Sequence, residues 1–180
     1  MAPCDAIETA AAVTWAAGHD GPAFLRLPRV GLPDLLPPGH RFVPGRADLL
    51  RDGDAVTLIA NGTLTHRMLK AADLLAAAGI FARVLNMATV RPIDVDAVVA
   101  AVRDTGAILT AEEHLTFGGL GSAIAEVVVE KSPAPMKILG VPGIFAPTGS
   151  AEFLLDEFGM SPAASATAAK ALTGRKAGRA

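Results

Sequence analysis

The chain has 180 residues and a formal net charge of −2, and its lysines and arginines are scattered except near the C-terminus. This charge pattern excludes an extended basic surface for nucleic acid, and the apolar runs are too short to cross a bilayer. Cys4 is the only cysteine, so an internal disulfide is impossible, as is usual in a reducing cytoplasm.

The first part of the chain predicts a helix, a strand and a linker. Residues 5–17 are good helix formers that begin at Asp5 and stop at Gly18. Pro22–Leu27 is an apolar run of strand length. The next residues, up to Pro44, are rich in proline, which cannot continue a helix or a central strand. We therefore place a domain boundary in this linker and expect it to lie along a surface.

Beyond the linker, strands and helices alternate. Apolar runs predict strands at 55–60, 81–86, 107–110 and 136–139. Helical periodicity predicts helices at 63–78, between Pro92 and Gly106, and at 120–130, 152–158 and 163–172, with Gly79 and Gly106 as helix ends. This alternation predicts an α/β fold, a three-layer sandwich with a mostly parallel sheet. The loops at the carboxyl ends of its strands are the expected place for ligands.

A group of reactive side chains precedes a glycine-rich run. Glu112, Glu113 and His114 stand before Gly118–Ser122. The run is partly like a dinucleotide fingerprint, but Ile124 replaces the third glycine and the turn is too long, so we expect the glycines to allow close helix packing. Neighbouring side chains of an extended segment point to opposite sides, so the three cannot converge on one metal ion. We therefore expect a structural role for this loop, with one glutamate bound to backbone N–H groups.

Several stretches of the chain resemble a known family when taken in order. They are Pro3–Ala10 with Trp15, Gly21–Arg29, Asp52–Gly62, Ala82–Met87 with Arg91–Asp94, and the run that starts at Glu112. Together they are similar to the C-terminal part of transketolase, a thiamine-diphosphate-dependent enzyme, especially the split kind with two subunits. The resemblance implies that residues 1–30 end a pyrimidine-binding domain, 31–44 form a linker and 45–173 form the transketolase C-terminal domain. Residues 174–180 are expected to be a disordered tail, and the family fold implies a fifth, antiparallel strand at one sheet edge.

The resemblance implies one substrate-binding position. Arg29 matches the arginine that contacts the phosphate group of sugar phosphates in transketolases, and Arg26 is the alternative. Either arginine could instead join the two domains through a carboxylate. The resemblance places no catalytic residue, cofactor site or metal site in this chain, because the diphosphate motif and the activating glutamate of the family have no counterpart in this sequence. The chain alone is therefore expected to be inactive.

The resemblance also implies partners. In the complete enzyme we expect thiamine diphosphate and Mg²⁺, a homodimer and/or an N-terminal transketolase subunit, and sugar phosphates of the pentose phosphate pathway. A cytoplasmic location is expected, without nucleic acid or membrane as partners. Deoxyxylulose-phosphate synthase and the β-chains of 2-oxoacid dehydrogenases share this domain and remain alternatives. A stand-alone α/β interaction or small-ligand module is the alternative from a different class.

Overall fold

One five-stranded sheet organises the chain, for which the computed structural model describes residues 1–176. The strand order is β1-β3-β2-β4-β5, with β1 antiparallel to β3 and all other neighbours parallel. The strands are β1 (Asp48–Arg51), β2 (Val56–Ala60), β3 (Ala82–Asn86), β4 (Ile108–Leu115) and β5 (Met136–Val141). The mostly parallel sheet, the adjacency of the four predicted strands and the antiparallel edge strand are thereby confirmed.

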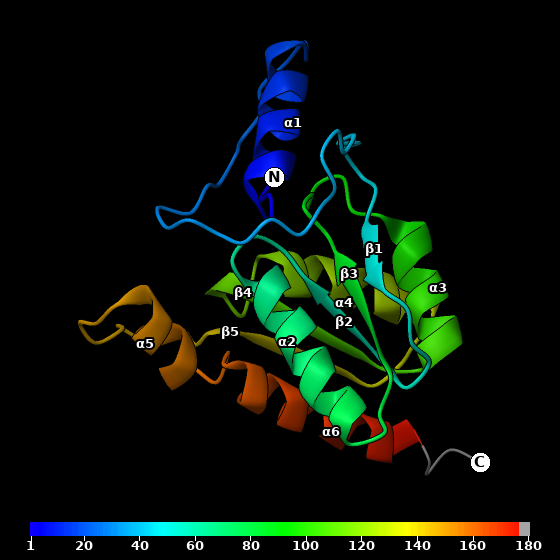
Figure 1. Ribbon diagram of the computed structural model, residues 1–180. Coiled ribbons are helices and arrows are strands. Elements are labelled where there is room, and N and C mark those ends of the chain that lie inside the picture. Colours follow the sequence, from blue (N-terminus) through cyan, green and yellow to red (C-terminus); the bar gives the residue numbers. More distant parts are fainter. Residues whose placement is uncertain (177–180) are drawn as a thin grey trace.

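Helices cover both faces of this sheet and give the molecule three layers (Figure 1). On one face lie α2 (Leu64–Ala77) and α6 (Pro162–Lys176), and on the other lie α3 (Val95–Thr105) and α4 (Leu120–Lys131). The predicted three-layer α/β fold is confirmed. Among residues 1–176, no helix is both long enough and apolar enough to span a bilayer.

The central strand β2 shows why the sheet forms here. All five of its residues are buried. Val56 and Leu58 belong to the apolar layer under α2 and α6, whereas Ile59 belongs to the layer under α3 and α4. A strand that is covered on both faces requires a continuous apolar run, and the sequence supplies one at this position.

Glycines mark the ends of two helices, as predicted. Gly106 is the C-cap residue of α3 with a φ of 72°, and Gly79 follows α2 with a φ of 75°. Glycine suits this left-handed conformation because it has no Cβ atom. α3 begins at Val95 and not at Pro92, because the Asp94 side chain accepts a hydrogen bond from a backbone N–H of the first turn and caps the helix there.

The strand predicted at Pro22–Leu27 is wrong, since this segment has no regular structure. The Arg26 N–H donates to the Met1 carbonyl at 2.8 Å, and the Met1 ammonium group donates to the Phe24 carbonyl at 2.7 Å. These bonds fix the segment but do not form a ladder, and a strand requires a neighbouring strand. The apolar run therefore remains extended and irregular.

Two boundaries also differ from the predictions. β4 continues to Leu115, because its pairing with β5 resumes there opposite Val141, so Glu112–His114 lie in the strand and not in a loop. α6 continues to Lys176, so residues 174–176 of the predicted disordered tail are helical. The alanine-rich sequence of α6 favours this extension. The rest of that predicted tail, 177–180, lies outside the described residues.

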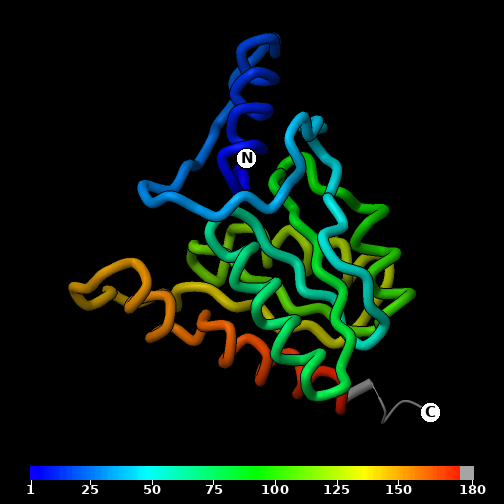
Figure 2. Tube along the Cα trace, viewed as in Figure 1, coloured from blue at the N-terminus to red at the C-terminus, as the bar shows by residue number. Residues whose placement is uncertain are grey.

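The N-terminal helix α1 (Ala6–Ala17) stands on the end of the sheet (Figure 1). The chain then runs back from the far end of α1 to the sheet before it enters β1 (Figure 2). Ala12 of α1 packs with Phe42 and Ala88 in a small apolar cluster. The Ala2 N–H donates to the Ala88 carbonyl at 2.7 Å, and the Gly62 N–H donates to the Ala2 carbonyl at 3.0 Å. The N-terminal segment is thus fixed against the loops that follow β2 and β3.

Candidate functional site

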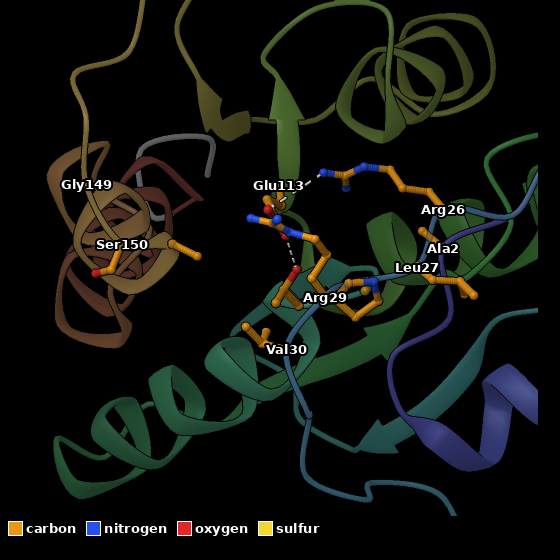
Figure 3. A pocket seen from close by; sticks show the side chains of 12 residues that line it. Ala2, Arg26, Leu27, Arg29, Val30, Glu113, Gly149 and Ser150 are labelled. Carbon is orange, nitrogen blue, oxygen red and sulfur yellow. Dashed lines mark hydrogen bonds and ion pairs between the residues drawn. The ribbon is translucent and has the colours of Figure 1, made fainter.

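A cleft lies where the N-terminal segment meets the carboxyl ends of β2 and β4 (Figure 3). Its volume is about 570 Å³, which is within the usual range of small-molecule sites. Its walls come from residues 26–30, from the β2–α2 loop, from β4 and from the start of α5 (Ala151–Glu157). The polar side chains that line it are Arg26, Arg29, Thr63, Glu113 and Ser150. The cleft therefore occupies the edge of the sheet at which ligands of parallel α/β folds bind.

The structure brings the two predicted arginines together in this cleft. Arg26 lies 3.8 Å from the Glu113 carboxylate, whereas Arg29 has no hydrogen-bond or ion-pair partner among the described residues. Figure 3 shows both side chains extending from one segment toward Glu113. An arginine fork without a carboxylate partner is suited to bidentate contact with a phosphate group. Arg26, and not Arg29, lies within ion-pair distance of a carboxylate of the sheet, that of Glu113 in β4.

The adjacent glutamates of β4 have separate surroundings. Glu113 lines the cleft, where its side chain is 34% exposed and accepts a hydrogen bond from the hydroxyl of Thr63. Glu112 is buried on the opposite side of the strand. The structural role expected for this loop therefore has different surroundings at its two glutamates, because the register of β4 turns Glu113 toward the arginines and Glu112 into the interior.

Glu112 caps helix α4. Its carboxylate accepts hydrogen bonds from the backbone N–H groups of Leu120 at 2.9 Å and Gly121 at 3.0 Å. A negative charge at this end of a helix is stabilised by the helix dipole. The chain's own carboxylate thus takes the place that a pyrophosphate would occupy in a dinucleotide site. The expected contact between one glutamate and backbone N–H groups is confirmed.

The glycines of this region allow close packing, as predicted. A Cβ atom on Gly119 would collide with the Glu112 carboxylate, and one on Gly121 would lie 2.5 Å from Cγ2 of Ile138. His114, at the exposed end of β4, has its Nδ1 atom 4.0 Å from the Glu112 carboxylate. Glu113 faces the cleft while Glu112 faces the interior, so Glu112, Glu113 and His114 do not converge on one point.

A buried arginine fixes the wall of the cleft that α5 provides. Arg67 of α2 donates to the Asp156 carboxylate at 2.6 Å and to the Met160 carbonyl at 3.2 Å. It also donates to the Glu152 carboxylate. These contacts hold both turns of a short helix whose N-cap residue, Ser150, lines the cleft. No sequence motif predicted this clamp, because its members are far apart in the chain.

A second polar cluster, which the sequence motifs also did not predict, lies under α1. Buried Glu8 accepts hydrogen bonds from the Cys4 N–H at 2.7 Å and from Nδ2 of Asn86 at 2.9 and 3.0 Å. Asn86 also donates to Asp48 at 3.3 Å, and His40 lies 3.8 Å from Asp48. Ligand atoms of Glu8, His40 and Asp48 lie within 4.8 Å of one another, which suits a metal ion. Since Glu8 is already satisfied by Cys4 and Asn86, we assign this cluster to the docking of α1.

Burial raises the pKa of the Glu8 carboxyl, although hydrogen bonds from Cys4 and Asn86 oppose the shift. Burial likewise raises the pKa of Asp48, and the electrostatic interaction with His40 opposes the shift. A carboxyl whose pKa is higher in the folded chain binds its proton more tightly when folded. Its contribution to stability is therefore complete below the unfolded pKa of about 4 and is lost as the pH rises through the folded pKa.

We expect the stability of the α1 junction to fall as the pH rises above the ordinary carboxyl range. Trp15 is the only tryptophan and lies in α1, so its fluorescence reports on this junction. Urea unfolding, followed by Trp15 fluorescence at several pH values, measures the effect. Glu8→Gln removes one titrating group and should flatten the pH dependence, whereas Asp20→Asn, at an exposed position, should not. An unfolding free energy that rises over this pH range in the native chain, relative to Glu8→Gln, would contradict the assignment.

Comparisons with known proteins place this chain in a family. A family model described as "Transketolase, C-terminal domain" matches residues 45–164. The chain is similar to the 6-deoxy-6-sulfo-D-fructose transketolase subunit SqwH of Clostridium sp. (strain MSTE9), with 39% identity over 174 residues, 97% of this chain and 54% of the relative. It is also similar to an apulose-4-phosphate transketolase subunit of Phocaeicola vulgatus, with 36% identity over 159 residues, 88% of this chain and 51% of the relative.

The resemblance extends to a synthase and to a solved structure. The 1-deoxy-D-xylulose-5-phosphate synthase of Desulforudis audaxviator (strain MP104C) is 36% identical over 165 residues, 89% of this chain and 26% of the relative. A structure described as "Split gene transketolase, inactive beta4 tetramer" matches with a TM-score of 0.88 and 41% identity, over 96% of this chain and 56% of the other. The chain spans about half the length of the transketolase subunits that it matches. By its sequence and its fold, the chain belongs to the transketolase family, whose C-terminal domain it contains.

Proposed function

We propose that this chain forms the C-terminal part of a transketolase that transfers two-carbon ketol groups between sugar phosphates. In this proposal, residues 1–30 end a pyrimidine-binding domain, 31–44 form a linker and 45–173 form the C-terminal domain. The single observation that carries the proposal is the cleft in which Arg29 presents a guanidinium group without a partner among the described residues. The transketolase subunits among the relatives support the reaction class.

The role proposed for Arg29 is to hold the phosphate group of the substrate. Two N–H groups along one edge of its guanidinium plane can donate to two phosphate oxygens at once. Arg26, from the same segment, adds a second positive charge near the same place, although the Glu113 carboxylate partly balances it. The positive end of the cleft thus attracts the charged group of a substrate and sets its orientation.

The residues of the cleft do not fit the cofactor of the family. Magnesium requires several oxygen ligands, and Glu113 is the one acidic side chain among the described residues that line the cleft. A single carboxylate cannot supply the set of oxygen ligands that Mg²⁺ needs, and the neighbouring arginines disfavour a cation. We therefore propose that thiamine diphosphate and Mg²⁺ are bound by other domains of the assembly, and that this chain contributes substrate binding and support.

The proposed assembly is a homodimer, or a complex with an N-terminal transketolase subunit, in the cytoplasm. Two relatives are named as transketolase subunits, and a similar solved structure is described as a tetramer of one subunit type. The single, buried cysteine agrees with a reducing compartment. A role in the pentose phosphate pathway belongs to the same proposal.

A second candidate is the C-terminal part of a 1-deoxy-D-xylulose-5-phosphate synthase. One such enzyme is 36% identical to the chain. The arginine-lined cleft suits that substrate class equally, because both reactions use phosphorylated sugars or aldehydes. The acceptor and donor that the assembled enzyme uses distinguish the two candidates.

The test of the proposal is reconstitution. The chain should be combined with, or joined to, a polypeptide that carries the diphosphate-binding and pyrimidine-binding domains. We expect ketol transfer from the combination and none from this chain alone. Transfer with pyruvate as the donor, and not with a ketose phosphate, would favour the synthase.

A further inference from the structure

The acidic side of the cleft is not explained by phosphate binding. Glu113 lines the same cavity as Arg26 and Arg29 and is one third exposed. A carboxylate beside an anion-binding group weakens anion binding, because like charges repel. A site for a bare phosphate would be better served by a neutral residue at this position. The cleft therefore carries a group suited to another part of the ligand.

Glu113 is held in place but keeps free acceptor capacity. The Thr63 hydroxyl, at the N-cap position of α2, donates to one carboxylate oxygen. The other oxygen faces Arg26 at 3.8 Å, which is beyond hydrogen-bond distance. A carboxylate has about four lone-pair sites, so most of them are available to a ligand in the cleft. Thr63 thus fixes the orientation of Glu113 without saturating it.

The arginines and the glutamate of the cleft are complementary to a ligand that carries both an anionic group and hydroxyl groups. The arginines offer donors to an anionic group, and the carboxylate offers acceptors to hydroxyl groups. We propose that Glu113, positioned by Thr63, accepts hydrogen bonds from ligand hydroxyl groups next to the anionic group bound by Arg29. The cleft thereby prefers polyhydroxylated phosphates to simple phosphates. This inference rests on the proposed function and identifies Glu113 as the residue that binds the sugar hydroxyl groups of the substrate.

The preference can be measured by titrating the full chain with three probes. They are inorganic phosphate, n-propyl phosphate and glycerol 3-phosphate, of which only the last carries neighbouring hydroxyl groups. NMR spectra of the backbone amides that line the cleft report binding. We expect glycerol 3-phosphate to bind about threefold to tenfold more tightly than propyl phosphate, since a hydrogen bond to a partly exposed charged group has that effect.

Glu113→Gln is the decisive variant. It should bring the two organic phosphates to nearly equal affinity and should tighten the binding of inorganic phosphate, because it removes a negative charge and strong acceptor sites. Glu126→Gln, an exposed glutamate of α4 that does not line the cleft, is the charge-matched control and should leave the preference unchanged. A preference that survives Glu113→Gln, or a native chain without any preference, would overturn the inference.

The proposed function fails in a different way. Arg29→Ala should weaken the binding of all three probes to a similar degree. If it does not, the anion site of the proposed function is wrong, whatever Glu113 does. If Arg29→Ala weakens all three probes while Glu113→Gln leaves their ratio unchanged, the anion site stands and the hydroxyl-binding role of Glu113 is wrong.

Discussion

In the assembled enzyme, Arg29→Ala is expected to raise the KM for phosphorylated sugars by about one to two decades and to leave cofactor binding intact. The substitution removes a charge-assisted contact to the phosphate group, which is typically worth about 1.5–3 kcal/mol. The KM for a substrate without a phosphate group should stay unchanged, because such a substrate does not make this contact. Steady-state kinetics with a phosphorylated and an unphosphorylated acceptor, side by side, measure the effect.

Two further variants make this result specific to the guanidinium group. Arg29→Lys keeps the charge but loses the planar fork, so we expect an intermediate KM. Arg41→Ala removes an exposed arginine outside the cleft and should change neither KM. If Arg29→Ala raises the KM equally for the phosphorylated and the unphosphorylated acceptor, the residue stabilises a domain interface and does not bind substrate.

Glu112→Ala is expected to lower the free energy of unfolding by about 2–4 kcal/mol. The buried carboxylate accepts two backbone hydrogen bonds at the start of α4, from Leu120 and Gly121. Without it, two donors at a buried helix end lose their acceptor, and the favourable interaction with the helix dipole is lost as well. Urea unfolding followed by far-ultraviolet circular dichroism measures the change in the whole domain.

The matched control for this prediction is Glu126→Ala, which shortens an exposed glutamate in the same helix and should change stability by less than about 0.5 kcal/mol. Glu112→Gln keeps one acceptor oxygen and should fall between the two. A loss below about 1 kcal/mol for Glu112→Ala would show that other groups or water satisfy these N–H groups, and that the carboxylate is not the cap that we describe.

The fold could be predicted wherever local pattern and tertiary structure agree. The apolar run around β2 correctly predicted a strand, because a strand that is covered on both faces needs such a run. Pro22–Leu27 is also mostly apolar but is not a strand, because no neighbouring strand pairs with it. Strand pairing is a property of the whole fold, so a local pattern cannot decide it.

The site was predictable only in part, for a similar reason. The alternation of side chains implied that Glu112 and Glu113 face opposite sides, but the sequence could not say which one is buried. The register of β4 decides this, and it brings Glu113 to Arg26 across 87 residues of chain. The hydrogen bond between the side chains of Glu8 and Asn86 likewise joins residues 78 positions apart. No local sequence pattern predicts such a contact.

We propose that this chain completes a transketolase and is inactive without the remaining domains. The most direct measurement is the rate of two-carbon transfer from a ketose phosphate to an aldehyde acceptor, with thiamine diphosphate and Mg²⁺ present. It compares this chain alone, the remaining domains alone and the combination of the two. We predict transfer by the combination only. Transfer by this chain alone, or no gain in rate when it is added to the remaining domains, would contradict the account.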